Sequence, residues 1–199
     1  MRCLLCHKRI GQDDLRELLM NEDILCSNCR KEWERINHSF TFHGVKGYAL
    51  WKYNNAFATS LLQYKERHDE ALQDIFFYLD KKRLHRMYKG YTLVPMPSTK
   101  KRLEERGFSH LQKMYACLDL PYLELLELKE EYDQKGKNIL DRQKMVNNII
   151  LKNNVQVPSK ILLVDDTFTT GSTMFGAMNA LAKSKKSVQI LTCSMSRVV

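Results

Sequence analysis

Two adjacent aspartates late in the chain stand where a strand gives way to a loop rich in hydroxyl groups. Residues 161–164 are a continuous apolar run, Asp165 and Asp166 follow it, and residues 167–173 add hydroxyls and a glycine. The run predicts a strand buried on both faces of a parallel sheet, and such sheets bind ligands beyond the carboxyl ends of their strands. A loop that opens a helix suits phosphate, whereas the carboxylates suit sugar hydroxyls or a metal ion. The stretch therefore predicts a site for a phosphorylated ribose.

A plainer explanation of the same residues is a polar turn that leads into an N-capped helix, a common join between strands and helices. Four aliphatic residues, two aspartates and a TTGST segment in that order are more specific than such a turn requires. The stretch is no Walker loop, because no GKS or GKT occurs at the spacing of that motif. We therefore favour the phosphate site.

Basic side chains follow a second predicted strand. Residues 91–96 form another apolar run that prolines stop, and Lys100, Arg102 and Arg106 come after it. Arginine can hold two phosphate oxygens at once, so these cations could receive a second anion such as pyrophosphate. Taken alone, the segment is explained as well by a solvated amphipathic helix. Together, the two strand ends match phosphoribosyl pyrophosphate (PRPP), which carries both a 5′-phosphate and a pyrophosphate.

Four of the six cysteines form two C-x-x-C pairs near the amino terminus. Cys3 and Cys6 are separated from Cys26 and Cys29 by 19 residues. Two such pairs supply the four thiolates of a tetrahedral zinc site, and a module this small needs the metal to fold. His7 adjoins Cys6, but four cysteines already complete the shell. Disulfides are the weaker alternative, and the module is either purely structural or a docking surface for nucleic acid or protein.

The other elements follow from hydrophobic periodicity. Residues 42–53 predict a strand or hairpin, and a helical pattern that includes Gly107 runs to residue 118. Further helices are expected at residues 30–36, 56–65, 71–87 and 174–181. Cys117 and Cys193 are expected to be buried packing residues. Alternating strands and helices predict an α/β fold with a mostly parallel sheet, and the chain divides into a zinc-binding module at 1–40 and a second domain at 41–199.

Composition sets broad limits. The chain is 44% hydrophobic and 28% charged, which is typical of a soluble globular protein. It has no apolar run long enough to span a membrane and no signal peptide, so a cytoplasmic protein is expected. Thirty-two basic against 23 acidic side chains give a net charge of +9, which attracts polyanions without choosing among them. Trp51 and Tyr53 could stack on nucleic-acid bases, although a core position is as reasonable for Trp51.

Two stretches carry a resemblance to known families. VDDTFTTGST resembles the PRPP loop of type I phosphoribosyltransferases, and VPMPSTKKRLEERGFSH is similar to the VPxP…R…RGFNQ stretch of the ComF (ComFC) family of late competence proteins. That family also has an amino-terminal four-cysteine module and an LxxYK stretch comparable to residues 61–65. Ser109 and His110 stand where the family commonly has Asn and Gln. In the segment after residue 133, Gln134, Arg142 and Val146 match the family pattern, while Met145 replaces Asn.

The resemblance implies a type I phosphoribosyltransferase-like core with a central mostly parallel sheet flanked by helices, plus the small zinc module. It implies that the two acids hold the ribose and that the loop holds the 5′-phosphate. The implied PRPP-binding residues are Asp165, Asp166, Thr167, Thr169, Thr170, Gly171, Ser172, Thr173 and Lys100. The implied catalytic residues are Asp165, Asp166, Arg102 and Arg106, with Mg²⁺ bound together with PRPP. Residues 132–145 would close over the site as a lid.

The resemblance further implies a competence protein that handles incoming single-stranded DNA in natural transformation. It would work at the cytoplasmic face of the membrane beside a helicase-like ATPase of the ComFA type. A second possibility is a nucleobase (purine or pyrimidine) phosphoribosyltransferase of the salvage type that releases pyrophosphate from PRPP, although no base-recognition motif is present. A third is a regulator that senses PRPP without chemistry. The zinc module favours the first, because a small salvage enzyme needs no such appendage.

Overall fold

A five-stranded sheet forms the centre of the computed structural model, which describes residues 1–10, 23–129, 148–184 and 186–196. Its order is β1-β2-β7-β6-β3; the first pair is antiparallel and the other three are parallel. β4 and β5 form a separate antiparallel pair. The strands are β1 (Arg35–Phe42), β2 (Val45–Lys52), β3 (Thr92–Pro95), β4 (Leu126–Leu128), β5 (Ile149–Leu151), β6 (Lys160–Phe168) and β7 (Ser187–Met195).

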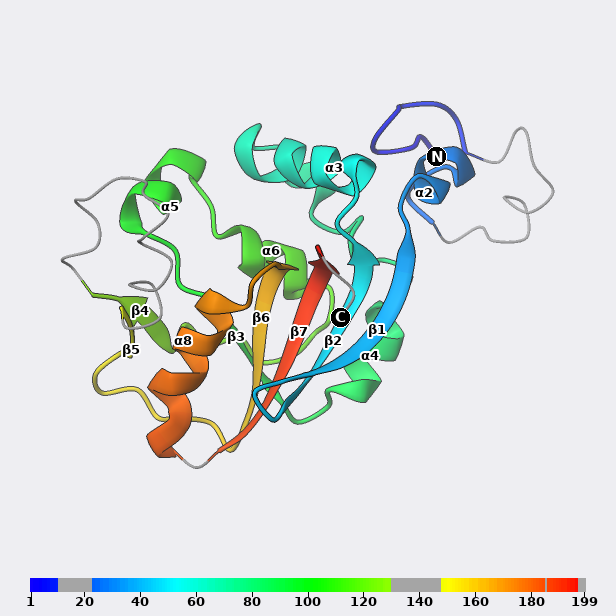
Figure 1. Ribbon diagram of the computed structural model, residues 1–199. Coiled ribbons are helices and arrows are strands. Elements are labelled where there is room, and N and C mark those ends of the chain that lie inside the picture. The colour runs from blue at the N-terminus through cyan, green and yellow to red at the C-terminus, as the bar shows by residue number, and fades with distance from the viewer. Residues whose placement is uncertain (11–22, 130–147, 185, 197–199) are drawn as a thin grey trace.

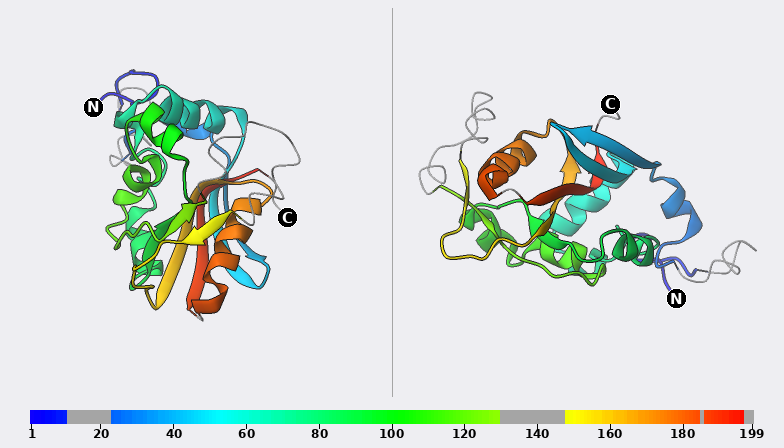
Figure 2. Two further views of the ribbon diagram at one scale, coloured as in Figure 1. Left: turned by 90° about the vertical axis from the view of Figure 1, so that its left-hand side faces the viewer. Right: turned by 90° about the horizontal axis from the view of Figure 1, so that it is seen from below.

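Helices cover both faces of the sheet. Figure 1 and the two views of Figure 2 show α8 on one face and α4 and α6 on the other. The helices are α2 (Ser27–Lys31), α3 (Asn55–Glu66), α4 (Lys81–Met87), α5 (Lys100–Arg106), α6 (His110–Ala116) and α8 (Ser172–Leu181), with short 3₁₀ turns η1 (Glu70–Leu72) and η3 (Ala182–Ser184). The prediction of an α/β fold with a mostly parallel sheet flanked by helices is confirmed.

The apolar run before the two aspartates is the buried middle of the sheet. Side chains at positions 161–164 are fully buried, and β6 lies between β7 and β3, as expected for a strand covered on both faces. The strand is longer than predicted, because its ladder with β7 continues through Asp165, paired with Thr192, as far as Phe168. The aspartates therefore lie inside the last half of β6 and not beyond its end.

Several predicted elements keep their place. The helix at 56–65 is α3, the strand at 91–96 is β3, and the helix at 174–181 is α8. The predicted hairpin is β1–β2, which begins earlier than expected and turns at His43 and Gly44. The predicted boundary at 40/41 falls within β1, and the division into two domains remains a prediction.

Two predicted helices are wrong in their extent. The helix at 30–36 is instead α2, which ends at Lys31, and Arg35 already belongs to β1. The helix at 71–87 is reduced to η1, turns and α4. The carbonyls of Ile75 and Phe76 accept hydrogen bonds from the Arg30 and Trp51 side chains, so they are engaged outside any helix.

The helical pattern across Gly107 is interrupted. Gly107 has φ +72° and caps the end of α5 in the left-handed conformation, which glycine adopts without strain. The chain then continues into α6 as a separate helix. The break matters for the site, since it turns His110 at the start of α6 inward.

Two expectations about packing are resolved by burial. Trp51 is only 2% exposed, and its indole N–H donates to the carbonyl of Phe76 at 3.0 Å, so it is a core residue and unavailable for stacking on DNA. Cys193 is buried as predicted, and Cys117 is partly buried against the same core. In the part of the chain that the structure describes, none of the helices combines the length and apolar character needed to cross a bilayer.

Candidate functional site

The carboxyl ends of β6 and β3 lie side by side at one edge of the sheet. Pro95 is in register with Val164, and the N–H of Met96 donates to the carbonyl of Val164 at 3.0 Å. Asp165 follows Val164 directly, so the acidic pair adjoins the segment that leads into α5. The two strand ends that the sequence marked as anion sites are therefore neighbours.

Asp166 is held by two side chains from other elements. Its Oδ2 accepts from Lys65 Nζ at 2.5 Å and from His110 Nε2 at 3.1 Å. Burial alone would raise the pKa of this carboxyl, but the Lys65 ammonium and the bond from His110 outweigh it and hold that pKa well below the usual range. Asp166 is therefore a carboxylate that is already charge-compensated by the chain.

His110 connects the acidic and the basic side of this edge. Its Nδ1 lies 3.1 Å from Arg106 NH1, while its Nε2 faces Asp166. Because the guanidinium can only donate, Nδ1 must accept, and the proton of a neutral imidazole then lies on Nε2. Burial lowers the pKa of His110, and the nearby Lys65 and Arg106 charges lower it further, which favours this neutral form.

The backbone around His110 is fixed by α3. The Tyr64 hydroxyl donates to the carbonyl of His110 at 2.7 Å, and Tyr64 also packs edge-on against Phe108. The LxxYK stretch therefore has a structural explanation: Leu61 and Tyr64 are buried, and Lys65 reaches the acidic pair. No role for Lys65 was predicted from the sequence, and the signal that could have indicated one is the LxxYK spacing shared with the family.

Asp165 has a different environment from its neighbour. Its half-buried side chain accepts from the N–H of Asp166 at 2.9 Å, and its carbonyl accepts from the Tyr115 hydroxyl at 2.8 Å. Burial and the adjacent Asp166 charge raise the pKa of Asp165 to about 8. This carboxyl is therefore easier to protonate than that of Asp166. Tyr115 was another residue that the sequence did not indicate.

The predicted phosphate loop turns into α8 at Gly171. Gly171 has φ +76°, and a Cβ there would lie 2.5 Å from Phe42 Cζ and 2.8 Å from Phe168 Cζ. Phe40 and Phe42 of β1 in turn pack on Phe168 with ring centroids 4.9 and 5.1 Å apart. This aromatic floor fixes the turn from below, so Gly171 is required both for its conformation and for its size.

The hydroxyls of the loop fall into two groups. Thr167 Oγ1 lies 2.9 Å from Ser194 Oγ on β7 and is therefore engaged within the sheet. Thr169 and Thr170 are exposed, and Thr170 Oγ1 lies 2.9 Å from Ser172 Oγ. The first turn of α8, with Ser172 and Thr173, presents N–H groups that have no partner within the helix, as a phosphate site needs.

The predicted basic residues differ in their exposure to solvent. Lys100 and Arg102 are exposed on α5. Arg106 instead turns inward, where it donates to Glu66 at 2.9 Å as well as contacting His110. The Arg106 guanidinium therefore already contacts two side chains of the chain itself, whereas the sequence suggested that it would be available to bind phosphate. The roles of all these residues in binding remain predictions.

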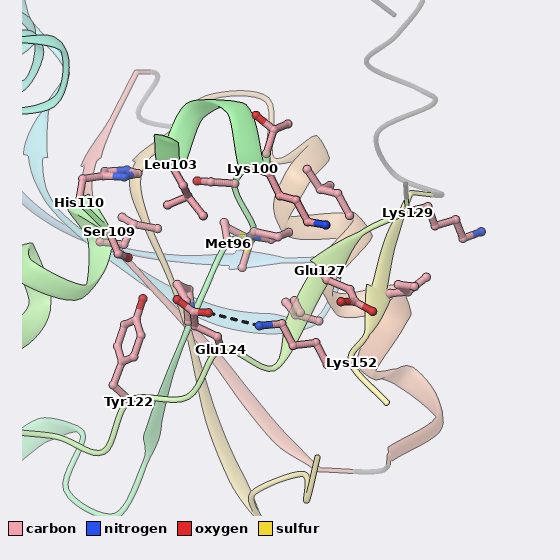
Figure 3. A pocket seen from close by; sticks show the side chains of 18 residues that line it. Met96, Lys100, Leu103, Ser109, His110, Tyr122, Glu124, Glu127, Lys129 and Lys152 are labelled. Carbon is pink, nitrogen blue, oxygen red and sulfur yellow. Dashed lines mark hydrogen bonds and ion pairs between the residues drawn. The ribbon is translucent and has the colours of Figure 1, made fainter. Parts of the chain in front are cut away.

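A cavity of about 750 Å³ opens beside this edge, between the end of β3, α5, α6 and the β4–β5 pair. Lys100, Ser109 and His110 line it, and Figure 3 shows an ion pair between Glu124 and Lys152 across its β4–β5 side. The two atoms of that pair are 3.2 Å apart. The cavity therefore adjoins the acidic pair through His110. The predicted lid at residues 132–145 lies outside the described residues.

The four cysteines of the amino-terminal module come together in space. The sulfur atoms of Cys3, Cys6, Cys26 and Cys29 all lie within 4.8 Å of one another, and those of Cys6 and Cys26 are 3.6 Å apart. Tetrahedral zinc at about 2.3 Å from each sulfur places neighbouring sulfurs about 3.8 Å apart. The cluster therefore fits a metal ion such as zinc, and the exposed His7 is not among its members.

Arg30 ties this module to the core. It forms a two-point ion pair with Asp23, donates to the carbonyl of Ile75, and lies over the rings of Trp33 and Trp51 at 5.0 and 5.6 Å. Trp33 is buried and stacks on Phe76. The segment that carries the cysteine cluster is thus attached to the central sheet through a buried aromatic contact.

Comparisons with solved structures find distant phosphoribosyltransferases. One is a hypoxanthine phosphoribosyltransferase from Staphylococcus aureus, 14% identical, with a TM-score of 0.39 over 63% of this chain and 62% of that one. Another is an adenine phosphoribosyltransferase from Saccharomyces cerevisiae, 10% identical, with a TM-score of 0.39 over 84% and 86%. At these scores the likeness carries no argument about this chain. No family model matches the sequence.

Comparisons with curated proteins are much closer. The competence protein ComFC of Streptococcus pneumoniae is 31% identical over 87% of this chain and 90% of its own length. ComFC of Bacillus subtilis is 26% identical over 98% and 94%, and competence protein F of Haemophilus influenzae is 30% identical over 48% and 45%. Identity at this level along nearly the whole length shows that the chain belongs to the ComFC family of competence proteins.

Proposed function

We propose that the chain is a competence protein that handles single-stranded DNA in natural transformation and binds PRPP at the edge formed by β6 and β3. One observation carries the PRPP part: the register between Pro95 and Val164 joins the acidic pair and the basic α5 segment into one site. PRPP has a ribose between a 5′-phosphate and a pyrophosphate, so it needs acceptors for hydroxyls flanked by two anion sites. This edge offers those groups in that order.

Each part of the edge takes one part of PRPP in this proposal. The loop around Gly171, with Thr169, Thr170, Ser172 and Thr173, holds the 5′-phosphate through N–H groups and hydroxyls. Asp165 and Asp166 hold the ribose hydroxyls, and Lys100 and Arg102 receive the pyrophosphate. Arg106 acts through His110 and Asp166, which it orients. Mg²⁺ bound with PRPP would be held by the Asp165 and Asp166 carboxylates and would supply positive charge for the pyrophosphate.

The cluster of Cys3, Cys6, Cys26 and Cys29 is proposed to hold structural zinc. Four thiolates are the ligand set of closed, four-coordinate zinc sites, which stabilise small modules directly. The attachment through Arg30 and Trp33 would transmit that stability to the sheet domain.

The DNA part rests on the family and on charge. The relatives are competence proteins by name, and a net charge of +9 favours binding to a phosphate backbone. We place the protein in the cytoplasm, at the inner face of the membrane through partners, with a helicase-like ATPase of the ComFA type among them.

The cavity beside His110 supports a second candidate, a nucleobase phosphoribosyltransferase of the salvage type. Its volume of about 750 Å³ lies within the range of small-molecule sites, about 300–1,000 Å³, and it adjoins the proposed ribose acids. A purine or pyrimidine whose addition releases pyrophosphate from PRPP would establish this candidate. Saturable PRPP binding with no pyrophosphate release would leave the ligand-binding competence protein.

Calorimetry on the zinc-loaded full chain tests the PRPP site. PRPP with Mg²⁺ should bind saturably to the wild type and at least tenfold more weakly to Asp165→Asn. Asp119→Asn is the matched control, because it makes the same change on an exposed residue whose φ of +50° asparagine also tolerates, and it should bind like the wild type. Equal affinity of all three proteins, or no binding to any, would contradict the proposed site.

A further inference from the structure

Four side chains of the basic segment KKRLHR form a concave cationic surface on α4. Lys81, Lys82, His85 and Arg86 line a hollow of about 600 Å³. Cys117 and Leu118 complete its wall, and Asp119 is the acidic side chain among the described lining residues. Lys82 and Arg86 are exposed, so their charges face solvent.

α4 carries no carboxylate of its own, whereas α5, the other basic helix, also carries Glu104 and Glu105. On α4, Arg83 pairs with Asp80, which lies just before the helix. Among the described residues, by contrast, no carboxylate lies within ion-pair distance of Lys82 or Arg86. An uncompensated group of cations is what a polyanion requires.

Aromatic rings accompany these cations at both ends of α4. Lys81 Nζ lies 4.2 Å from the centroid of the half-buried Tyr78 ring. Beyond the other end, Lys160 Nζ lies 5.7 Å from the ring of half-buried Tyr91, which contacts Tyr88 at the end of α4. Lysines beside partly exposed tyrosine rings occur on surfaces that bind single-stranded nucleic acid, because cations follow the backbone and rings can stack on bases.

The surface lies away from the proposed PRPP site. α4 leads into the beginning of β3, whereas the acidic pair and α5 lie at the carboxyl ends of the strands. Figure 1 shows α4 and α5 at opposite ends of the sheet. A DNA strand on α4 would therefore leave the PRPP edge open.

We infer that the α4 hollow, with its flanking Tyr78–Lys81 and Tyr91–Lys160 pairs, is the surface that holds the backbone of single-stranded DNA. The inference rests on the proposed function and names its DNA-contacting surface. A concave cationic surface with tyrosine rings beyond each end of α4 suits a flexible strand better than a flat anionic membrane, which has no bases to stack.

Fluorescence anisotropy of a labelled oligothymidine against the zinc-loaded full chain, over a salt series, tests this surface. Lys82→Gln/Arg86→Gln removes two exposed cations from α4. Each lost phosphate contact reduces the slope of log K against log salt by about 0.7, so the slope should fall by about 1.4 and the affinity at least tenfold at low salt. Lys46→Gln/Lys183→Gln removes two exposed cations elsewhere and is the matched control.

The outcomes separate the two claims. Binding by the wild type that both double variants weaken equally would show that net charge alone acts, and would overturn the α4 assignment while leaving DNA handling intact. No binding by the wild type at low salt would overturn the DNA part of the proposed function and the α4 surface with it. Unchanged DNA binding combined with loss of binding to phosphatidylserine vesicles would assign the surface to a membrane. PRPP affinity by calorimetry should be the same in all three proteins.

Discussion

The neighbouring ends of β6 and β3 hold their charges in opposite ways. At β6, Asp166 is bonded by Lys65 and His110 from two other elements and is nearly enclosed. At β3, Lys100 and Arg102 project from the first turns of α5 into solvent. Lys65 and His110 hold the acidic end in place before any ligand binds, whereas at the basic end no carboxylate among the described residues forms an ion pair with Lys100 or Arg102. The difference shows that the acidic half holds its carboxylate in a fixed position, whereas the basic half presents exposed positive charge that can attract an anion.

Arg106 and Asp165 each differ from the other charged residues of their own end. Arg106 starts on the basic helix but turns toward His110 and Glu66, so it belongs to the acidic half. Asp165 belongs to the acidic half, yet none of the described cations forms an ion pair with it, and burial together with the Asp166 charge raises its pKa to about 8. A bound Mg²⁺ would take the place of that missing cation. Within the acidic half, the charge of Asp166 is thus compensated by Lys65, whereas Asp165 has no such partner among the described residues.

The largest expected effect comes from removing the cation at the acidic end. Lys65→Met leaves the enclosed Asp166 charge with only the bond from His110. Removal of one partner of a buried ion pair costs about 3–5 kcal/mol. Because the two side chains are 19% and 12% exposed, we expect the low end, about 3 kcal/mol, in the free energy of unfolding by denaturant titration.

Two further variants show whether the charge is the cause. Lys65→Met combined with Asp166→Asn removes both charges and should recover most of the lost stability. Lys100→Met makes the same change at the basic end and should alter stability by less than about 0.5 kcal/mol. Equal losses for Lys65→Met and Lys100→Met would break the contrast between the two ends.

A smaller difference in stability is expected between alanine substitutions at Gly171, which precedes α8, and Gly107, which ends α5. Gly171→Ala meets both a left-handed conformation and the Phe42 and Phe168 rings, whereas Gly107→Ala meets the same conformation in open space. The conformation costs about 1–2 kcal/mol at either position. Crowding at position 171 should add about 1 kcal/mol, measured as the difference between the two variants. A difference near zero would mean that the aromatic floor yields easily and does not fix the loop.

The sequence located the β6 strand and the cysteine cluster better than the distant side chains that contact Asp166. The cysteine spacing and the order of aliphatics, aspartates and hydroxyls are local patterns, so they located the cysteine cluster and the strand that carries Asp165 and Asp166. Lys65 lies 101 residues from Asp166 and His110 lies 56 residues away. Contacts of that separation depend on how α3 and α6 pack on the sheet, which no local spacing encodes.

The misjudged helix at 71–87 has the same cause. Its apolar spacing is helical, but the carbonyls of Ile75 and Phe76 accept hydrogen bonds from Arg30 and Trp51 in distant segments, which override the local pattern. Gly107 is a different case. Its left-handed conformation and the bond from its N–H to the Leu103 carbonyl are local features that end α5, although the apolar periodicity continues across them.

The smallest expected effect tests the residue that joins the two ends. His110→Gln should change stability at pH 7.5 by less than about 0.5 kcal/mol. Glutamine offers one acceptor and one donor side, as a neutral imidazole does, so it can accept from Arg106 and donate to Asp166. His110→Leu keeps the volume but loses both bonds, and should cost at least about 1 kcal/mol.

Acid pH separates histidine from glutamine. The pKa of His110 is lowered by burial and by the facing Lys65 and Arg106, although Asp166 opposes them. Below about pH 6.5 the unfolded chain then binds a proton that the folded chain does not. The free energy of unfolding therefore decreases as the pH is lowered, by up to about 1.4 kcal/mol per pH unit in this window. His110→Gln lacks this loss, and its free energy of unfolding should exceed that of the wild type at pH 5.5 while matching it at pH 7.5. Acid loss of metal from the cysteine cluster affects both proteins and cancels in the difference. Parallel stability profiles would mean that His110 keeps its charge when buried, and that Arg106 and Asp166 are not joined through a neutral ring.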